Sequence, residues 1–193
     1  IGETSGVATI TISLDESVII NLAQDGSISS WGVDRYADRR QDNIIRQLDP
    51  YTGRTENYNE SADEAFRGKI RFIGKTQITY YASFDNKILS GKIKSIGNLA
   101  LDYFANFDEA GAQGKLKSVG RTAIAYYAAY ENEAYRQKVK SIGNVTVTYY
   151  PSVVDKAFAG KVKTLNGSEF VYYTSQDQPG LKGALRRGRQ IQV

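Results

Sequence analysis

The chain has 193 residues, of which 41% are hydrophobic and 24% charged, as in ordinary folded domains. Its net charge of +4 is a small basic excess, so nucleic acid is not the expected partner. The absence of His and Cys excludes disulfides, His- or Cys-based catalytic triads and the usual zinc, copper and haem ligands, and we expect no cofactor. No apolar run is long enough for a transmembrane helix.

The N-terminal segment, residues 1–46, is expected to form a β-hairpin cap followed by a linker. Alternating or β-branched apolar residues predict three strands, at residues 7–13, 17–22 and 28–31. The charged stretch 35–43 breaks this pattern and is predicted to be a loop or a short helical linker.

A 23-residue repeat occupies most of the remaining chain. The phrase GKIKSIGNLALDYF at 91–104 has counterparts that begin at residues 68, 114, 137 and 160. In each copy, two turn-forming residues such as Gly97-Asn98 separate two short apolar stretches, which is typical of a two-residue β-hairpin loop. The fifth copy has Asn166-Gly167 there, the favoured type I′ dipeptide.

The repeats set the predicted organisation and fold. We expect tandem β-hairpin repeats over 47–182, degenerate over 47–67 and clear over 68–182, followed by a basic C-terminal cap or tail over 183–193. Short strands with short connections predict an all-β antiparallel meander that forms an extended, twisted or curved sheet. A parallel β-solenoid is the alternative, since its coils have a similar length.

The hairpin register assigns side chains to faces. Two-residue loops place Ile96 opposite Leu99, Lys94 opposite Leu101 and Lys92 opposite Tyr103 on one face, and Ile93 on the other. The apolar residues equivalent to Ile93 are then expected to form one ladder opposite the Lys–Tyr pairs, so that neither face is uniformly apolar. The doubled aromatics are expected to form two ladders, one on each face.

A basic and aromatic face is the sharpest candidate for binding. Two cations at i and i+2 and one tyrosine recur in each repeat, a pattern that suits an acidic polysaccharide or another polyanion, or a protein partner. The alternative interpretation is structural, with solvated lysines and cross-strand aromatic packing. The candidate residues are Lys69, Arg71, Lys92, Lys94, Lys115, Lys117, Lys138, Lys140, Lys161, Lys163, Tyr80, Tyr103, Tyr126, Tyr149 and Tyr172.

Catalysis is not expected. Asp85, Asp108 and Glu131 recur in register at turn tips, and a carboxylate pair is the minimum that glycoside hydrolysis needs. A repeated acid at a turn is nevertheless a structural signature, whereas an active site needs several convergent roles at one place. A glycosidase therefore remains only as a weaker alternative.

The phrase GK-aliphatic-KSIGN…YY…FD resembles uncharacterised tyrosine-rich repeat proteins of bacterial envelopes, over roughly residues 45–182. More loosely, the chain resembles the YD (Rhs-type) and MORN hairpin repeats, although it lacks the Tyr-Glu-Gly of MORN and the Tyr-Asp dipeptide of YD repeats. The resemblance implies an exported location and a non-catalytic role. We expect a structural or protein-interaction module, with a protein partner in the envelope or self-association and with acidic polysaccharide binding as the alternative.

Overall fold

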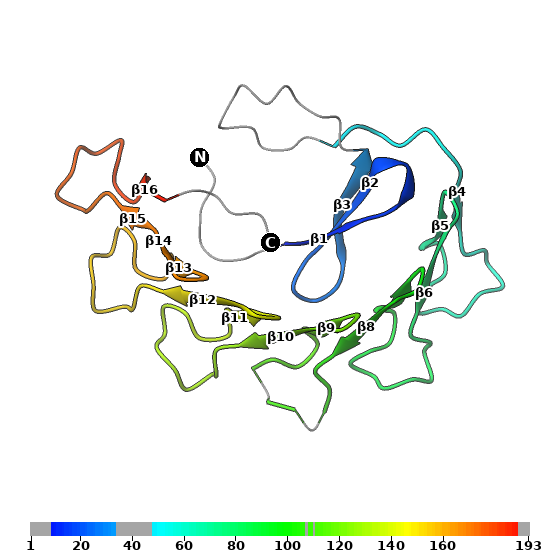
Figure 1. Cartoon of the computed structure of the whole chain (residues 1–193). Helices are drawn as coiled ribbons and strands as arrows, with labels where there is room; N and C mark the ends of the chain where they lie inside the picture. Colours follow the sequence, from blue (N-terminus) through cyan, green and yellow to red (C-terminus); the bar gives the residue numbers. More distant parts are fainter. Residues whose placement is uncertain (1–8, 34–47, 107, 110, 189–193) are drawn as a thin grey trace. The chain divides into compact units, whose positions relative to one another are not determined.

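The computed structural model describes residues 9–33, 48–106, 108–109 and 111–188 (Figure 1). Over these residues the protein is all-β, without an α-helix and with one short 3-10 turn at Asp15–Ser17. The linker predicted at 35–43 lies outside the described residues. The strands are β1 (Ile10–Ser13), β2 (Val18–Leu22), β3 (Ile28–Val33), β4 (Thr55–Asn57), β5 (Ile70–Ile73), β6 (Thr76–Tyr80), β7 (Ile93–Ile96), β8 (Leu99–Tyr103), β9 (Leu116–Val119), β10 (Thr122–Tyr126), β11 (Val139–Ile142), β12 (Val145–Tyr149), β13 (Val162–Leu165), β14 (Ser168–Glu169), β15 (Val171–Tyr172) and β16 (Leu185–Arg187).

The strands follow one another as a meander. β4 to β14 form an 11-stranded sheet in sequence order, which is not closed, and β1 to β3 and β15–β16 form a three-stranded and a two-stranded sheet. The paired strands run antiparallel, so the predicted hairpin meander is confirmed and the parallel solenoid is wrong. Within each hairpin, antiparallel pairing follows from a two-residue loop, which is too short for a parallel crossover.

Two compact units divide the chain and are described separately. The N-terminal unit comprises residues 9–105 and 114–120. The C-terminal unit has its described residues within 106–113 and 121–188. In the N-terminal unit, the loops that follow β4 and β6 extend away from the β1–β3 sheet (Figure 1).

The hairpin loops have the predicted backbone geometry. Gly97 has a φ of 56°, and Ser95 and Ile96 pair with Ala100 and Leu99 as expected. In the fifth repeat, Asn166 and Gly167 have φ values of 47° and 81°, as a type I′ turn requires. The turn residues therefore fix the register within each hairpin.

A β-bulge between successive hairpins changes the predicted faces. Thr79 pairs with Ser95 but Tyr80 pairs with Ile93, so Lys94 is the extra residue of the bulge. The bulge turns Ile93 and Ile96 toward the same side, and both are buried. The expectation that the residues equivalent to Ile93 lie opposite the tyrosine face is therefore wrong. The corresponding extra residues of the other bulges are Arg71, Lys117, Lys140, Lys163 and Arg186.

The buried apolar side chains therefore gather on one face of each hairpin, but Thr76 opposite Ile73 and Ser168 opposite Leu165 keep that face from being uniformly apolar, as predicted. In the N-terminal unit, Ile78, Ile96 and Leu101 are buried, as are Ile20 and Leu22 of β2. Burial of side chains of this size stabilises a fold by about 1.5–3 kcal/mol each. The other face carries polar contacts, of which the hydroxyl pairs Thr79–Ser95 and Thr148–Thr164, both at 2.6 Å, are examples.

Hydrogen bonds connect the long loops of neighbouring repeats. Asp155 Oδ1 accepts the Ala157 N–H at 2.9 Å within its own loop, and its Oδ2 accepts the Ser175 N–H at 2.8 Å from the next loop. Asn132 accepts equivalent bonds from Ala134 and Ser152, both at 3.0 Å. Each loop is thus held both by its own turn and by its neighbour.

Candidate binding surface

The expected single stripe of cations divides into two rows with different surroundings. We call Lys69, Lys92, Lys115, Lys138 and Lys161 the inner lysines. We call Arg71, Lys94, Lys117, Lys140 and Lys163 the outer cations. The bulge separates the rows, because every outer cation is the extra residue of a bulge and every inner lysine precedes the strand.

Lys69, Lys138 and Lys161 of the inner row hold neighbouring repeats together. The Nζ atoms of Lys69 and Lys138 donate hydrogen bonds of 2.6 Å to the backbone oxygens of Gly91 and Gly160, 22 residues further on. Lys161 makes the same contact with Gly183 at 2.5 Å. Burial lowers the pKa of Lys69, Lys115 and Lys138, with a further contribution from the Lys92 charge at Lys69.

Lys69, Lys92, Lys138 and Lys161 also lie over the tyrosines predicted to be their partners. The Nζ–ring centroid distance is 5.3 Å for Lys69–Tyr80, Lys92–Tyr103 and Lys138–Tyr149, and 5.5 Å for Lys161–Tyr172. These distances are within the range of cation–π attraction. The predicted Lys–Tyr contacts are therefore present in these four repeats.

The outer cations are exposed and lie over the aromatic residue of the preceding repeat. Lys140 Nζ is 5.2 Å from the Tyr127 ring centroid, and Lys94 Nζ is 5.6 Å from that of Tyr81. Arg71, Lys117 and Lys163 make equivalent contacts with Tyr58, Phe104 and Tyr150. Their charged groups are exposed, so a ligand in solvent can reach them.

The predicted binding tyrosines are part of the packing. Tyr103 is 2% exposed, and its hydroxyl donates to the Ile93 backbone oxygen at 2.8 Å. Tyr80 and Tyr149 make the same contact with Ile70 and Val139. Burial raises the pKa of Tyr80 to about 12 and that of Tyr103 further.

The second aromatic of each pair connects successive repeats. The Tyr127 hydroxyl donates to the Val147 backbone oxygen at 2.9 Å, and its ring is 5.8 Å from Tyr149 and 4.8 Å from Tyr135. Tyr150, Phe158 and Tyr172 form the same triad one repeat later. The paired rings therefore do not form two separate ladders as expected, because the second ring of one repeat contacts the first ring of the next.

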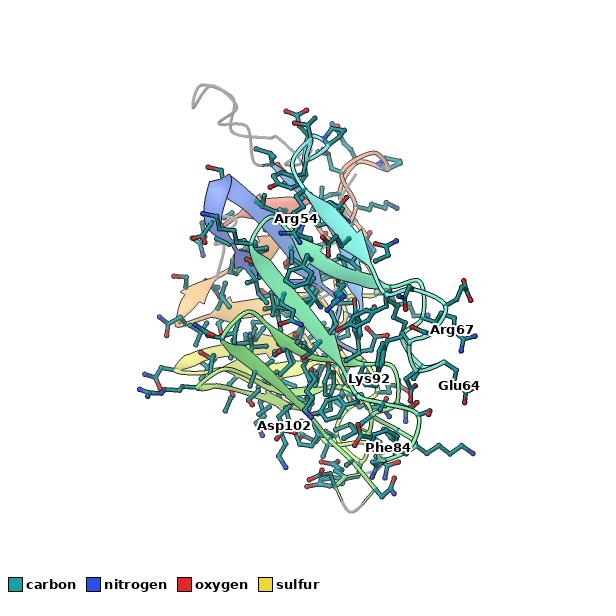
Figure 2. All side chains as sticks on the ribbon, turned by 90° about the vertical axis from the view of Figure 1, so that its right-hand side faces the viewer. Arg54, Glu64, Arg67, Phe84, Lys92 and Asp102 are labelled. Atoms are coloured by element: carbon teal, nitrogen blue, oxygen red, sulfur yellow. The ribbon has the colours of Figure 1, made fainter. Side chains whose placement is uncertain are left out.

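Large apolar side chains are exposed at the loop tips, and this feature was missed in the sequence. Phe84, Tyr130 and Val153 are 87%, 90% and 86% exposed. They hold the same position of the 23-residue repeat, and Phe107 holds it too but lies outside the described residues. This recurrence is the signal that could have identified them. We call Phe84, Tyr130 and Val153 the loop-tip residues, and Figure 2 shows Phe84 on its loop, with Glu64 and Arg67 on the preceding loop.

The repeated acids act within the turns. Asp85 Oδ2 accepts the Ala82 N–H at 2.7 Å, and Glu131 Oε1 accepts the Ala128 N–H at 3.1 Å. In the described part of the chain, no group of three or more His, Cys, Asp or Glu side chains is placed to hold a metal ion. No helix among the described residues is long and apolar enough to cross a membrane.

Comparisons with known proteins give no relative. The chain matches no protein-family model, and no curated protein or solved structure is significantly similar to it.

Proposed function

We propose that this protein is a non-catalytic structural or protein-interaction module of the bacterial cell envelope or exterior, and that its loop-tip residues contact a protein partner. The observation that carries the proposal is the exposure of large apolar side chains at one repeat position. Exposed apolar patches mark interaction sites, and aromatic residues are enriched in them.

The loops beneath the loop-tip residues support this role. Tyr130 and Val153 lie on consecutive loops of the C-terminal unit, which are joined by the Asn132–Ser152 contacts. An apolar side chain on a loop that is already ordered loses less conformational freedom on binding than one on a disordered loop. The location in the envelope rests on the sequence resemblance alone.

Site-specific photo-crosslinking in the producing cells tests this proposal. We expect a crosslinker at position 130 to give a discrete protein adduct, which a crosslinker at the exposed strand position Thr146 does not give. The double variant Tyr130→Ser/Val153→Ser should lose the partner. The matched control Glu133→Ser/Lys156→Ser changes two exposed charged residues of the same loops and should retain it. Equal loss in both double variants would contradict the proposal.

Binding of an acidic polysaccharide is the second candidate, and the exposure of the outer cations favours it. Within the N-terminal unit, Arg71, Lys94 and Lys117 recur once per hairpin, which is about 9–10 Å along the sheet for two strand spacings. Replacement of Lys94, Lys117 and Lys140 by Gln should abolish salt-dependent binding to polygalacturonate. If affinity survives the triple change, the outer cations are a solvated face only.

A further inference from the structure

A cavity of about 590 Å³ lies in the N-terminal unit, between the β2–β3 turn and the first two clear repeats. One wall is the turn residues 25–28, and the others are residues 68–70 with Tyr80 and residues 90–93 with Ile88. Its volume is typical of a small-molecule site, which combines apolar walls with a few convergent polar groups.

Two ammonium groups of consecutive repeats line this cavity. Lys69 Nζ donates one hydrogen bond to Gly91 O at 2.6 Å, and Lys92 Nζ donates one to Asp25 O at 3.0 Å. An ammonium group has three N–H donors, so an acceptor that enters the cavity can bond to both lysines. Burial lowers the pKa of Lys69, and the charge of Lys92 lowers it further, which shows that the two charges repel each other. A bound oxyanion would relieve this repulsion.

Lys92 departs from the pattern of the other inner lysines. Lys69, Lys138 and Lys161 each bind the backbone oxygen of a glycine 22 residues further on, whereas Lys92 binds the oxygen of Asp25 in the β2–β3 turn. Figure 2 shows Lys92 on the ribbon near the start of β7. The turn thus holds Lys92 at the cavity.

The turn itself is fixed against the repeats. The Gln24 backbone oxygen accepts the Leu116 N–H at 2.8 Å. Gly26 has a φ of 77°, and a Cβ there would lie 2.3 Å from the Tyr103 hydroxyl oxygen, so only glycine fits. The cavity wall is therefore built by close packing and by backbone hydrogen bonds.

A carboxylate completes the polar lining. Asp25 Oδ1 accepts the Ser27 N–H at 2.9 Å and the Ser27 hydroxyl at 2.7 Å. Burial alone raises the pKa of Asp25, but these hydrogen bonds and the Lys92 charge outweigh it, so the pKa lies below its usual value. An ionised carboxylate accepts further hydrogen bonds, and hydroxyl groups are suitable donors.

We propose that this cavity binds one acidic sugar residue, a uronate, whose carboxylate lies between Lys69 and Lys92 and whose hydroxyl groups donate to Asp25. A simple anion uses only the lysines and is repelled by Asp25, whereas a neutral sugar uses only the carboxylate. A uronate carries both complementary groups in one molecule. This site is independent of the proposed protein partner, because no loop-tip residue lines it.

Calorimetric titration of the full chain with galacturonate, galactose and inorganic phosphate tests the proposal. We expect galacturonate to bind at least tenfold more tightly than either of the others. Lys92→Met should weaken galacturonate binding at least tenfold. The matched control Lys75→Met removes an exposed cation of the first clear hairpin, which neither lines the cavity nor belongs to the outer cations, and should leave binding unchanged.

Other outcomes would overturn the site. Phosphate binding as tight as galacturonate binding would show a general anion site, and no galacturonate binding would show that the cavity has another role. Equal losses in Lys92→Met and Lys75→Met would show a general attraction to positive charge and not binding in the cavity. If Lys92→Met fails to fold, Asp25→Asn is the second test. It should weaken galacturonate binding and strengthen phosphate binding, and the opposite pattern would contradict the proposal.

Discussion

The inner lysines and the outer cations are two residues apart in every repeat, yet they have different surroundings. Lys138 is half-buried and donates to the backbone of the next repeat, whereas Lys140 is exposed, over the Tyr127 ring. The cause is the bulge, which places Lys140 outside the strand pairing. Charges that look equivalent in a repeated sequence can therefore have different contacts: Lys138 holds the next repeat, and Lys140 faces solvent.

The largest loss of stability is expected when the tyrosine beneath an inner lysine is replaced. Tyr149 is 4% exposed and contacts Tyr127 and Tyr135, so Tyr149→Ala should lower the free energy of unfolding by about 3–5 kcal/mol. The matched change Tyr130→Ala removes an exposed ring and should change it by less than about 0.5 kcal/mol. Urea denaturation measures both, and similar losses would contradict the assigned packing.

Alanine substitutions at two glycines test how closely neighbouring loops pack at the glycine that accepts the hydrogen bond from Lys138. Gly160 and Gly68 have φ values of 75° and 76°, but a Cβ on Gly160 would lie 2.6 Å from the Ala134 backbone oxygen, whereas none lies within 4 Å at Gly68. Gly68→Ala should therefore cost about 1–2 kcal/mol, from the left-handed conformation alone. Gly160→Ala should cost about 1–3 kcal/mol more, because the neighbouring loop must move. Thermal denaturation measures both variants, and equal decreases in melting temperature for Gly68→Ala and Gly160→Ala would show that the loops are not closely stacked.

Alkaline pH should weaken the contacts around the inner lysines. Burial raises the pKa of Tyr80 from 10.0 to about 12, and it raises that of Tyr103 further. Since the unfolded chain loses these protons first, the stability contribution of the tyrosines is complete below pH 10 and is lost as the pH rises through their folded-state pKa values. The lowered pKa of Lys138 acts in the opposite sense, because the unfolded chain binds that proton more tightly. Denaturation followed between pH 9 and 12 should show a net loss of stability, and an unchanged midpoint would contradict tyrosine burial.

Local turn chemistry made the hairpins predictable, and the bulges explain what was missed. The pairs Gly97-Asn98 and Asn166-Gly167 specify two-residue loops, so the register within a hairpin followed from the sequence. The register between successive hairpins could not be predicted from the sequence. The bulge at Lys94 leaves the same order of apolar residues that a regular strand would have. The division of the lysines into two rows could not be predicted without that bulge.

The cavity was beyond sequence reasoning for another reason. It brings Asp25 together with Lys69 and Lys92, which are more than 40 residues away in the chain, and no repeat copy carries an equivalent of the β2–β3 turn. By contrast, the exposed position shared by Phe84, Tyr130 and Val153 was visible in the sequence as a recurrence. The structure was needed only to show that these side chains are exposed.

One pair of variants tests the separation of the two rows most directly. Lys138→Met removes a hydrogen bond to the Gly160 oxygen and should lower the free energy of unfolding by about 1.5–3 kcal/mol, the usual contribution of a hydrogen bond to a charged group. Lys140→Met keeps an apolar stem over Tyr127 and should change it by less than about 0.5 kcal/mol. We predict this difference in parallel urea denaturation of the two variants, and equal losses, or a larger loss for Lys140→Met, would contradict the account.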